Sequence, residues 1–416
     1  METPKSISTF IDSLADQLPN ERMARINRYI DRLFFKTMKR LSDGTIFVLT
    51  GDIPAMWIRD STWQVLPLLE MRPDAEVCEI LGSVSRRQAK FLLVDPYANA
   101  FNETPSGDCW HKDFADQSPW VFERKFELDS WSTFLELAIS LYEKTGYEKH
   151  LDHDFWSATE KIVDLCFVEQ NHDSKSYRLH RKNAPIADYL SHDGHGAPVA
   201  FTGLVWSGFR PSDDRCIYGY HIPSNAHLSV VLRRLSKVAT YFGHTNLANR
   251  VAALSLQIAE AIKTACNKNG RFPYEIDGLG KAIYLDDPNI PSLLSLPNLG
   301  FCRKEDESYQ ATRSWLLSDA HEYYVNHSGL VGFSSEHTPQ DWIWPLSIAM
   351  IGLTSTHNTE LLDSIAQLEC TDGGTGDMHE SFSPADPRDF TRPWFSWADM
   401  TFVLLCVIAS KNLIDN

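Results

Sequence analysis

The sequence predicts an all-α protein folded as an (α/α)6 barrel, with six inner and six outer helices and small β-hairpins in the loops. Two observations predict this class. Apolar residues recur at spacings of three and four along most of the 416 residues, as in Leu228, Val231, Leu232 and Leu235. Segments with one polar face also alternate with segments that are apolar nearly all round, a pattern typical of surface helices alternating with buried ones.

The expected outer helices carry charges throughout and cover residues 21–40, 74–94, 151–169, 245–267, 305–323 and 358–369. The expected inner helices each follow an aromatic, polar loop and begin near Ile58, Leu128, Ile222, Ile290, Trp342 and Phe395. Short hairpins are expected at 45–50 and 177–180. Because no linker or low-complexity tract interrupts the chain, we expect a single (α/α)6-barrel domain over residues 1–416. An open helical solenoid is the alternative, but the sequence has no repeat of fixed period.

The composition of the chain excludes some classes of binding partner and predicts the cellular compartment. The 39 Lys and Arg residues against 55 Asp and Glu residues give a net charge of −16, which argues against nucleic acid and anionic membranes as partners. The start of the chain does not resemble a secretory signal, and no apolar run reaches the roughly 18 residues of a membrane span. The eight cysteines occur singly, as expected for reduced thiols. We therefore expect a cytoplasmic protein.

Unusual polar and aromatic residues precede the expected inner helices, and in an alternating ring these ends share one face. The segments are 51–63, 101–113, 125–131, 207–225, 334–345 and 378–399. Aromatic rings cover the C–H faces of a sugar, while carboxylates and guanidinium groups bind its hydroxyls. The pattern therefore predicts a carbohydrate site at one mouth of the barrel.

Three long motifs occur in this order along the chain: GDIPAMWIRDS, SGFRPSDDRCIYGYHIPSN, and the pair HESF and RPWFSWAD. Together they resemble glycoside hydrolase family 125, the metal-independent exo-α-1,6-mannosidases. The similarity extends from about residue 20 to the C-terminus. It implies an (α/α)6 barrel that removes a terminal α-1,6-linked mannose from an oligosaccharide with inversion of anomeric configuration.

An inverting glycosidase needs a protonated acid at the leaving oxygen and a carboxylate that activates water. The resemblance places the acid in SDD, at Asp213 or Asp214, and the base at Glu380 in MHESF. Asp214 is slightly favoured over Asp213, although one sequence does not fix the register of a neighbouring pair. Two adjacent carboxylates also disfavour each other's ionisation, which keeps an acid protonated. A capped loop at Pro211–Asp213 is the plain structural alternative.

Arg59 and Asp60, which follow Trp57, are expected to clamp mannose hydroxyls; a structural ion pair with Asp60 as a helix N-cap is compatible with that role. Further candidate sugar-binding residues are Trp110, His111, Tyr220, Asn225, Arg392 and Trp394. Trp342 and Trp344 are interpreted as barrel packing.

No metal and no cofactor are expected. His192, Asp193 and His195 cluster in SHDGHG, but the glycines favour a solvent loop, and neither HExxH nor an EF-hand pattern occurs.

Two other functions stay open. One is a different carbohydrate-active enzyme on the same barrel, either another exo-glycosidase or a phosphorylase that binds its anion at Arg388 or Arg392. The other is a catalytically silent sugar-binding protein, against which the presence of both carboxyls argues.

Overall fold

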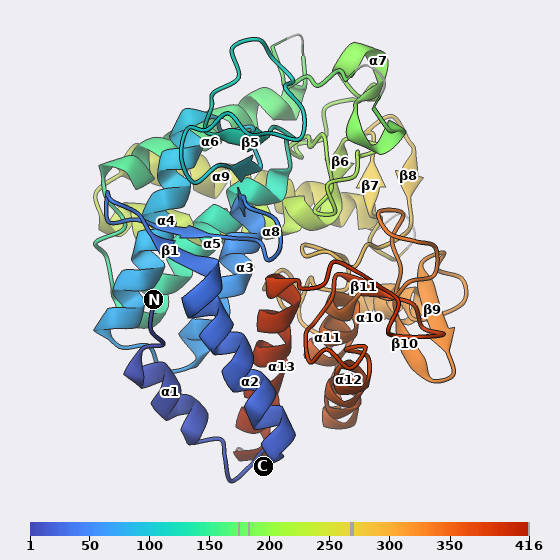
Figure 1. The fold of residues 1–416 in the computed structure, drawn as a ribbon. Coiled ribbons are helices and arrows are strands. Elements are labelled where there is room, and N and C mark those ends of the chain that lie inside the picture. The colour runs from blue at the N-terminus through green and yellow to red at the C-terminus, as the bar shows by residue number, and fades with distance from the viewer. Residues whose placement is uncertain (174, 182–183, 267–269, 415–416) are drawn as a thin grey trace.

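The computed structural model describes residues 1–173, 175–181, 184–266 and 270–414. Its inner ring contains α3 (Ile58–Val65), α5 (Leu128–Thr145), α8 (Ile222–Tyr241), α11 (Pro345–Leu353) and α13 (Ser396–Ile414). Contacts run from α3 to α5, from α5 to α8 and from α11 to α13, and α13 closes the ring against α3. In Figure 1 the red helix α13 accordingly lies beside the blue N-terminal helices.

The outer helices agree with the expected alternation. They are α2 (Asn20–Arg32), α4 (Ala75–Val94), α6 (His153–Asn171), α9 (Thr245–Cys266), α10 (Glu307–Leu316) and α12 (Asn358–Cys370). Asp74 and Asp152 begin α4 and α6 by accepting hydrogen bonds from main-chain N–H groups of the first turn. The end expected for α9, position 267, lies outside the described residues. An additional helix, α1 (Lys5–Asp12), precedes the ring.

The all-α barrel is confirmed, with one inner position filled differently from the prediction. No helix begins near Ile290; residues 291–300 form bends and turns instead. Their side chains are mostly buried, so the segment packs like an inner element. Three prolines at 288, 291 and 297 remove main-chain donors, which explains why the apolar run does not form a helix.

Small antiparallel sheets occupy the loops, as expected for the hairpin at 45–50: β1 (Met38–Arg40) pairs with β2 (Ile46–Val48). The hairpin expected at 177–180 is wrong, because no strand forms there. The other strands are β3 (Met56–Trp57), β4 (Ala100–Phe101), β5 (Val121–Glu123), β6 (Tyr220–His221), β7 (Glu275–Ile276), β8 (Ala282–Ile283), β9 (Tyr324–His327), β10 (Leu330–Phe333), β11 (Ser381–Phe382) and β12 (Phe390–Thr391). The short helical turns are η1 (Leu33–Thr37), η2 (Leu66–Glu70), η3 (Ile186–Asp188) and α7 (Ser191–Gly194).

Two three-stranded sheets fix the ends of inner helices. The first has the order β3-β4-β5 and the second the order β6-β7-β8. β3 continues directly into α3 and β6 directly into α8, so each sheet holds the first residues of its helix in a set direction. All eight residues of α3 are buried, including Arg59 and Asp60. Charged groups are thereby placed inside the barrel at the end that the sequence predicts for the site.

Within the described residues, no helix has both the length and the apolar character that a membrane crossing requires. All eight cysteines are free thiols, and five of them are buried.

Candidate active site

A cavity of about 450 Å³ lies at the N-terminal ends of the inner helices. It brings together eight of the residues expected in the site: Trp57, Arg59, Asp60, Trp110, His111, Asp213, Glu380 and Arg392. Trp110 is 55% exposed and therefore lies at the rim, whereas Arg59 is 3% exposed and lies deep in the barrel. The polar lining and size are typical of a small-molecule site.

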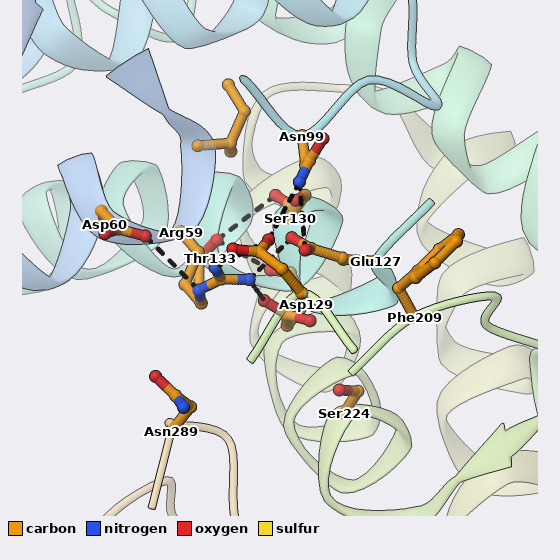
Figure 2. A network of polar contacts seen from close by, with 12 residues as sticks. Arg59, Asp60, Asn99, Glu127, Asp129, Ser130, Thr133, Phe209, Ser224 and Asn289 are labelled. Carbon is orange, nitrogen blue, oxygen red and sulfur yellow. Dashed lines mark hydrogen bonds and ion pairs between the residues drawn. The ribbon is translucent and has the colours of Figure 1, made fainter. Parts of the chain in front are cut away.

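Arg59 is the centre of a buried network of charges. Its Nη1 donates a hydrogen bond of 2.6 Å to Oε2 of Glu127 and one of 3.2 Å to Oδ2 of Asp129. Its Nε lies 3.4 Å from Oδ2 of Asp60, and its Nη2 lies 3.6 Å from Oδ1 of Asp213. Figure 2 shows the guanidinium between Asp60 on one side and Glu127 and Asp129 on the other. Asp60 does not cap α3, because it lies within the helix and accepts a hydrogen bond from Thr50.

This network contains more acids than bases. Six carboxyl groups surround Arg59 and Lys125; they belong to Asp60, Glu123, Glu127, Asp129, Asp188 and Asp213. Burial raises the pKa of Glu127 well above its ordinary value, and the neighbouring carboxylates of Asp213 and Asp129 raise it further against the opposing charge of Arg59. Since buried like charges cannot all ionise, the network retains a proton at neutral pH.

Asp213 connects this network to the cavity. Its side chain is 23% exposed, while that of Glu127 is fully buried. The two carboxyls are hydrogen-bonded to each other, and Asn99 Nδ2 donates to both, at 3.0 Å to Glu127 and 3.2 Å to Asp213. Burial alone would raise the pKa of Asp213, but the hydrogen bond from Glu127 and the charge of Arg59 lower it. The pair therefore holds one proton, mainly on the more buried Glu127.

The main chain holds Asp213 in a defined position. Its φ of 67° lies in the left-handed region, which aspartate tolerates better than most residues. The Nζ of Lys125 donates to the carbonyl of Asp213 at 2.8 Å, and a turn joins the N–H of Asp213 to the carbonyl of Arg210 at 3.0 Å. The loop cap expected at Pro211–Asp213 is thus a turn and not a helix start.

Asp214 points elsewhere and does not line the cavity. Its carboxylate accepts a hydrogen bond of 3.0 Å from Ser212 and pairs at 3.3 Å with Nδ1 of His337, which does line the cavity. Burial by itself would lower the pKa of His337, but the hydrogen bond to Asp214 and the negative charges of Asp214, Glu380 and Asp213 raise it to about 9. His337 is therefore a cation at neutral pH.

Glu380 enters the cavity from the loop between α12 and β11, and its side chain is 13% exposed. Nη1 of Arg392 lies 3.5 Å from its Oε1. Arg392 is itself fixed by Asp52, at 2.6 Å, and by the carbonyl of Thr50, at 2.7 Å. This carboxylate can therefore hold and orient a polar ligand such as water.

Tyr220 and Asn225 do not reach the cavity. The hydroxyl of Tyr220 donates to the carbonyl of Gln170 at 3.2 Å. Asn225 is fully buried and exchanges hydrogen bonds of 2.8 and 2.9 Å with the main chain of Val205. Tyr220 thus joins β6 to the end of α6, and Asn225 joins the first turn of α8 to the segment at Val205, so both side chains are structural supports.

Trp394 also lies outside the cavity lining. Its Nε1 donates to Oδ2 of Asp399 at 3.0 Å, and the guanidinium of Arg32 lies 5.1 Å from its ring centre. The neighbouring aromatic residues Phe395 and Trp397 line the cavity instead.

Sequence reasoning missed several further lining residues. The polar, aromatic segments that precede the inner helices contain Lys125, His337, Trp344, Phe395 and Trp397, but nothing in the spacing of these residues separates a lining side chain from a packing one. Thr50, Glu123, Asp188 and Asn289 lie outside the motifs altogether, and no sequence signal indicates them.

In the described part of the chain, no three His, Cys, Asp or Glu side chains gather as metal ligands would. Ser191–Gly194 (α7) form a tight turn, since His192 and Asp193 have positive φ values of 51° and 55°. The ring of His195 stacks on that of His172 with the centroids 4.2 Å apart.

Three comparisons relate this chain to known proteins. Residues 20–407 match the family model described as metal-independent alpha-mannosidase (GH125). A Schizosaccharomyces pombe protein, the meiotically up-regulated gene 157 protein, is 32% identical over 96% of this chain and 85% of its own length. A solved metal-independent α-mannosidase from Streptococcus pneumoniae, in a non-productive complex with α-1,6-mannobiose, is 38% identical with a TM-score of 0.95, over 99% of this chain and 100% of that chain.

More distant structures share the fold alone. A bacterial glucoamylase in complex with acarbose superposes with a TM-score of 0.57 at 12% identity, over 86% of this chain and 49% of that chain. The family model and the Streptococcus pneumoniae structure carry the functional information. The chain belongs to the metal-independent α-mannosidases, glycoside hydrolase family 125.

Proposed function

We propose that this α-mannosidase is an exo-acting enzyme that removes terminal α-1,6-linked mannose from oligosaccharides with inversion of anomeric configuration. The observation that carries the mechanism is that two carboxyls from separate loops, Asp213 and Glu380, line the same cavity. An inverting mechanism needs such a pair, one member to protonate the leaving oxygen and one to activate water.

Asp213 is the proposed general acid in preference to Asp214, because Asp213 faces the cavity and shares a proton with Glu127. The proton held on Glu127 moves to Asp213, and Asp213 passes it to the glycosidic oxygen. Glu380 takes a proton from water, whose oxygen attacks the anomeric carbon from the other side of the ring. The C–O bond to the leaving sugar breaks in the same step, so the product is β-mannose.

The depth of the cavity supports action at a chain end. Trp397 borders the cavity and also belongs to the wall of a second cavity deeper in the barrel, so the first cavity has a floor. Arg59 and Asp60 lie deep in the site, where hydroxyl groups of a terminal sugar would need partners. The α-1,6-mannobiose bound to the Streptococcus pneumoniae relative supports the linkage. The cytoplasmic location stays a prediction.

The test is to incubate the protein with α-1,6-, α-1,2- and α-1,3-mannobiose, with and without a chelator and phosphate, and to follow products by NMR from the first seconds. We expect cleavage of the 1,6 isomer alone, with β-mannose appearing before mutarotation and no effect of either addition. Initial α-mannose would contradict inversion, and mannose 1-phosphate would identify a phosphorylase. Binding without cleavage would indicate a silent sugar-binding protein.

A further inference from the structure

A second cavity of about 410 Å³ opens at the opposite end of the barrel, between the C-terminal halves of the inner helices. Its wall includes residues 298–300, in the segment that takes the place of the fourth inner helix. Because that segment is not helical, it leaves space that a full helix would fill. Trp397 borders both cavities, so the second one lies directly beneath the mannosidase site.

The second cavity differs in chemistry from the first. Its wall is mainly aliphatic and aromatic, with Trp63, Leu299, Met350, Leu353 and Leu404 among the lining residues. A sugar would lose hydrogen bonds to water here and find few replacements. A flat or extended apolar group of comparable volume would instead be well covered.

The mouth of the second cavity carries an excess of positive charge, although the chain as a whole is acidic. Arg234 pairs with Glu136 at 2.7 Å and with Glu143 at 2.9 Å. Lys144 and Lys411 both bind Glu70. Arg233 is exposed and lines the cavity, and its guanidinium has no acidic partner among the residues that the structure describes. An anionic group at the mouth would therefore meet an uncompensated cation.

Two indole groups in the wall lack an acceptor. Trp63 is 9% exposed and Trp397 is 1% exposed, and within the described chain neither Nε1–H has a hydrogen-bond partner. Buried indole N–H groups usually find one. Both nitrogens are closed off from solvent, so these two side chains contribute apolar ring surface to the cavity wall.

We propose that this second cavity binds a small amphipathic anion, with its apolar body between Trp63 and Trp397 and its acidic group at Arg233. The ligand class covers aromatic and short-chain aliphatic carboxylates and sulfonates. Binding at this site is independent of the proposed linkage specificity and mechanism, because it is measured without a sugar substrate.

The first probe is 8-anilino-1-naphthalenesulfonate, titrated into the full-length protein while dye fluorescence and tryptophan quenching are recorded. We expect one saturable site, and binding about tenfold weaker in Arg233→Glu. The matched control is Lys237→Glu, which changes an exposed cation on the same helix that does not line the cavity. N-Phenyl-1-naphthylamine, which has the same rings without the sulfonate, should bind more weakly than the sulfonate.

A second variant, Leu353→Trp, is designed to fill the cavity and should abolish the saturable phase while mannosidase activity reports that the barrel is folded. Competition by 1-naphthoate and by decanoate shows whether a ring or a chain fits better. The proposal is overturned if binding is not saturable at one site. It is equally overturned if Arg233→Glu and Lys237→Glu weaken binding alike.

Discussion

Arg59 donates a hydrogen bond of 2.6 Å to Glu127, and both side chains are sealed inside the barrel. Glu127 is also hydrogen-bonded to Asp213 at the edge of the cavity, so the ion pair with Arg59 positions a carboxyl that contacts the proposed general acid. The arginine holds Glu127 in place while burial keeps its carboxyl protonated. Asp213, at the cavity edge, is thus hydrogen-bonded to a buried carboxyl that keeps its proton and that water does not reach.

Glu127→Gln keeps the shape of the side chain but removes its acidic proton. We expect the alkaline limb of kcat/KM for α-1,6-mannobiose to move to lower pH, because Asp213 then loses its proton more easily. The matched control is Asp129→Asn, which removes one negative charge beside Arg59 but leaves both carboxyls of the Glu127–Asp213 pair in place. An equal shift in both variants would mean that the effect comes from Arg59 alone.

Asp213→Asn and Asp214→Asn together identify the acid. A leaving group that departs readily needs little protonation, so the acid variant should be nearly inactive on the disaccharide yet comparatively active on a dinitrophenyl mannoside. Because Asp213 lines the cavity and Asp214 does not, we expect this selective defect in Asp213→Asn. Asp214→Asn should lower both rates in similar proportion through His337. The reverse result would move the acid by one residue.

Glu380→Gln cannot take a proton from water, although it keeps nearly the same volume. We expect turnover to fall by roughly 10²–10⁴, the usual contribution of general acid–base catalysis, with little change in Tm. Asp386→Asn is the matched control, since this partly exposed carboxylate pairs with Arg388 in the connection between β11 and β12 and does not line the cavity. A Glu380→Gln enzyme with more than about a tenth of the wild-type rate would rule out the assigned base.

His337 should make stability depend on pH. Its pKa rises from the ordinary value of 6.5 to about 9 in the folded chain, so its contribution is complete below pH 6.5 and is lost as pH rises through about 9. The free energy of unfolding should therefore differ between wild type and His337→Gln at pH 6, and the difference should shrink at pH 9.5. Urea denaturation measures it.

The matched control for that experiment is His153→Gln, at an exposed histidine whose side chain is 92% accessible. Its difference from wild type should stay nearly constant over the same pH range. A constant difference for His337→Gln as well would show that Asp214 and Glu380 do not hold the imidazole in its charged form.

The sequence by itself determines the barrel and the end at which the site lies. Alternation of amphipathic and fully apolar segments depends only on which helix faces meet water, so it predicts α3, α5, α8, α11 and α13 and their outer partners. The fourth inner position is the exception, because prolines at 288, 291 and 297 override an apolar pattern that otherwise suits a helix. The motifs likewise place Asp213 and Glu380 in loops that the ring brings together.

Only the tertiary structure decides which member of each motif faces the ligand. Asp213 and Asp214 are adjacent in sequence, but a left-handed turn sends one toward Asn99 and Glu127 and the other toward His337. Tyr220 and Asn225 have the composition of sugar ligands, yet they bond to the main chain around them. Contacts between residues far apart in the chain also bring Glu127 next to Asp213, and a shared proton depends on that distance and on burial, neither of which a single sequence contains.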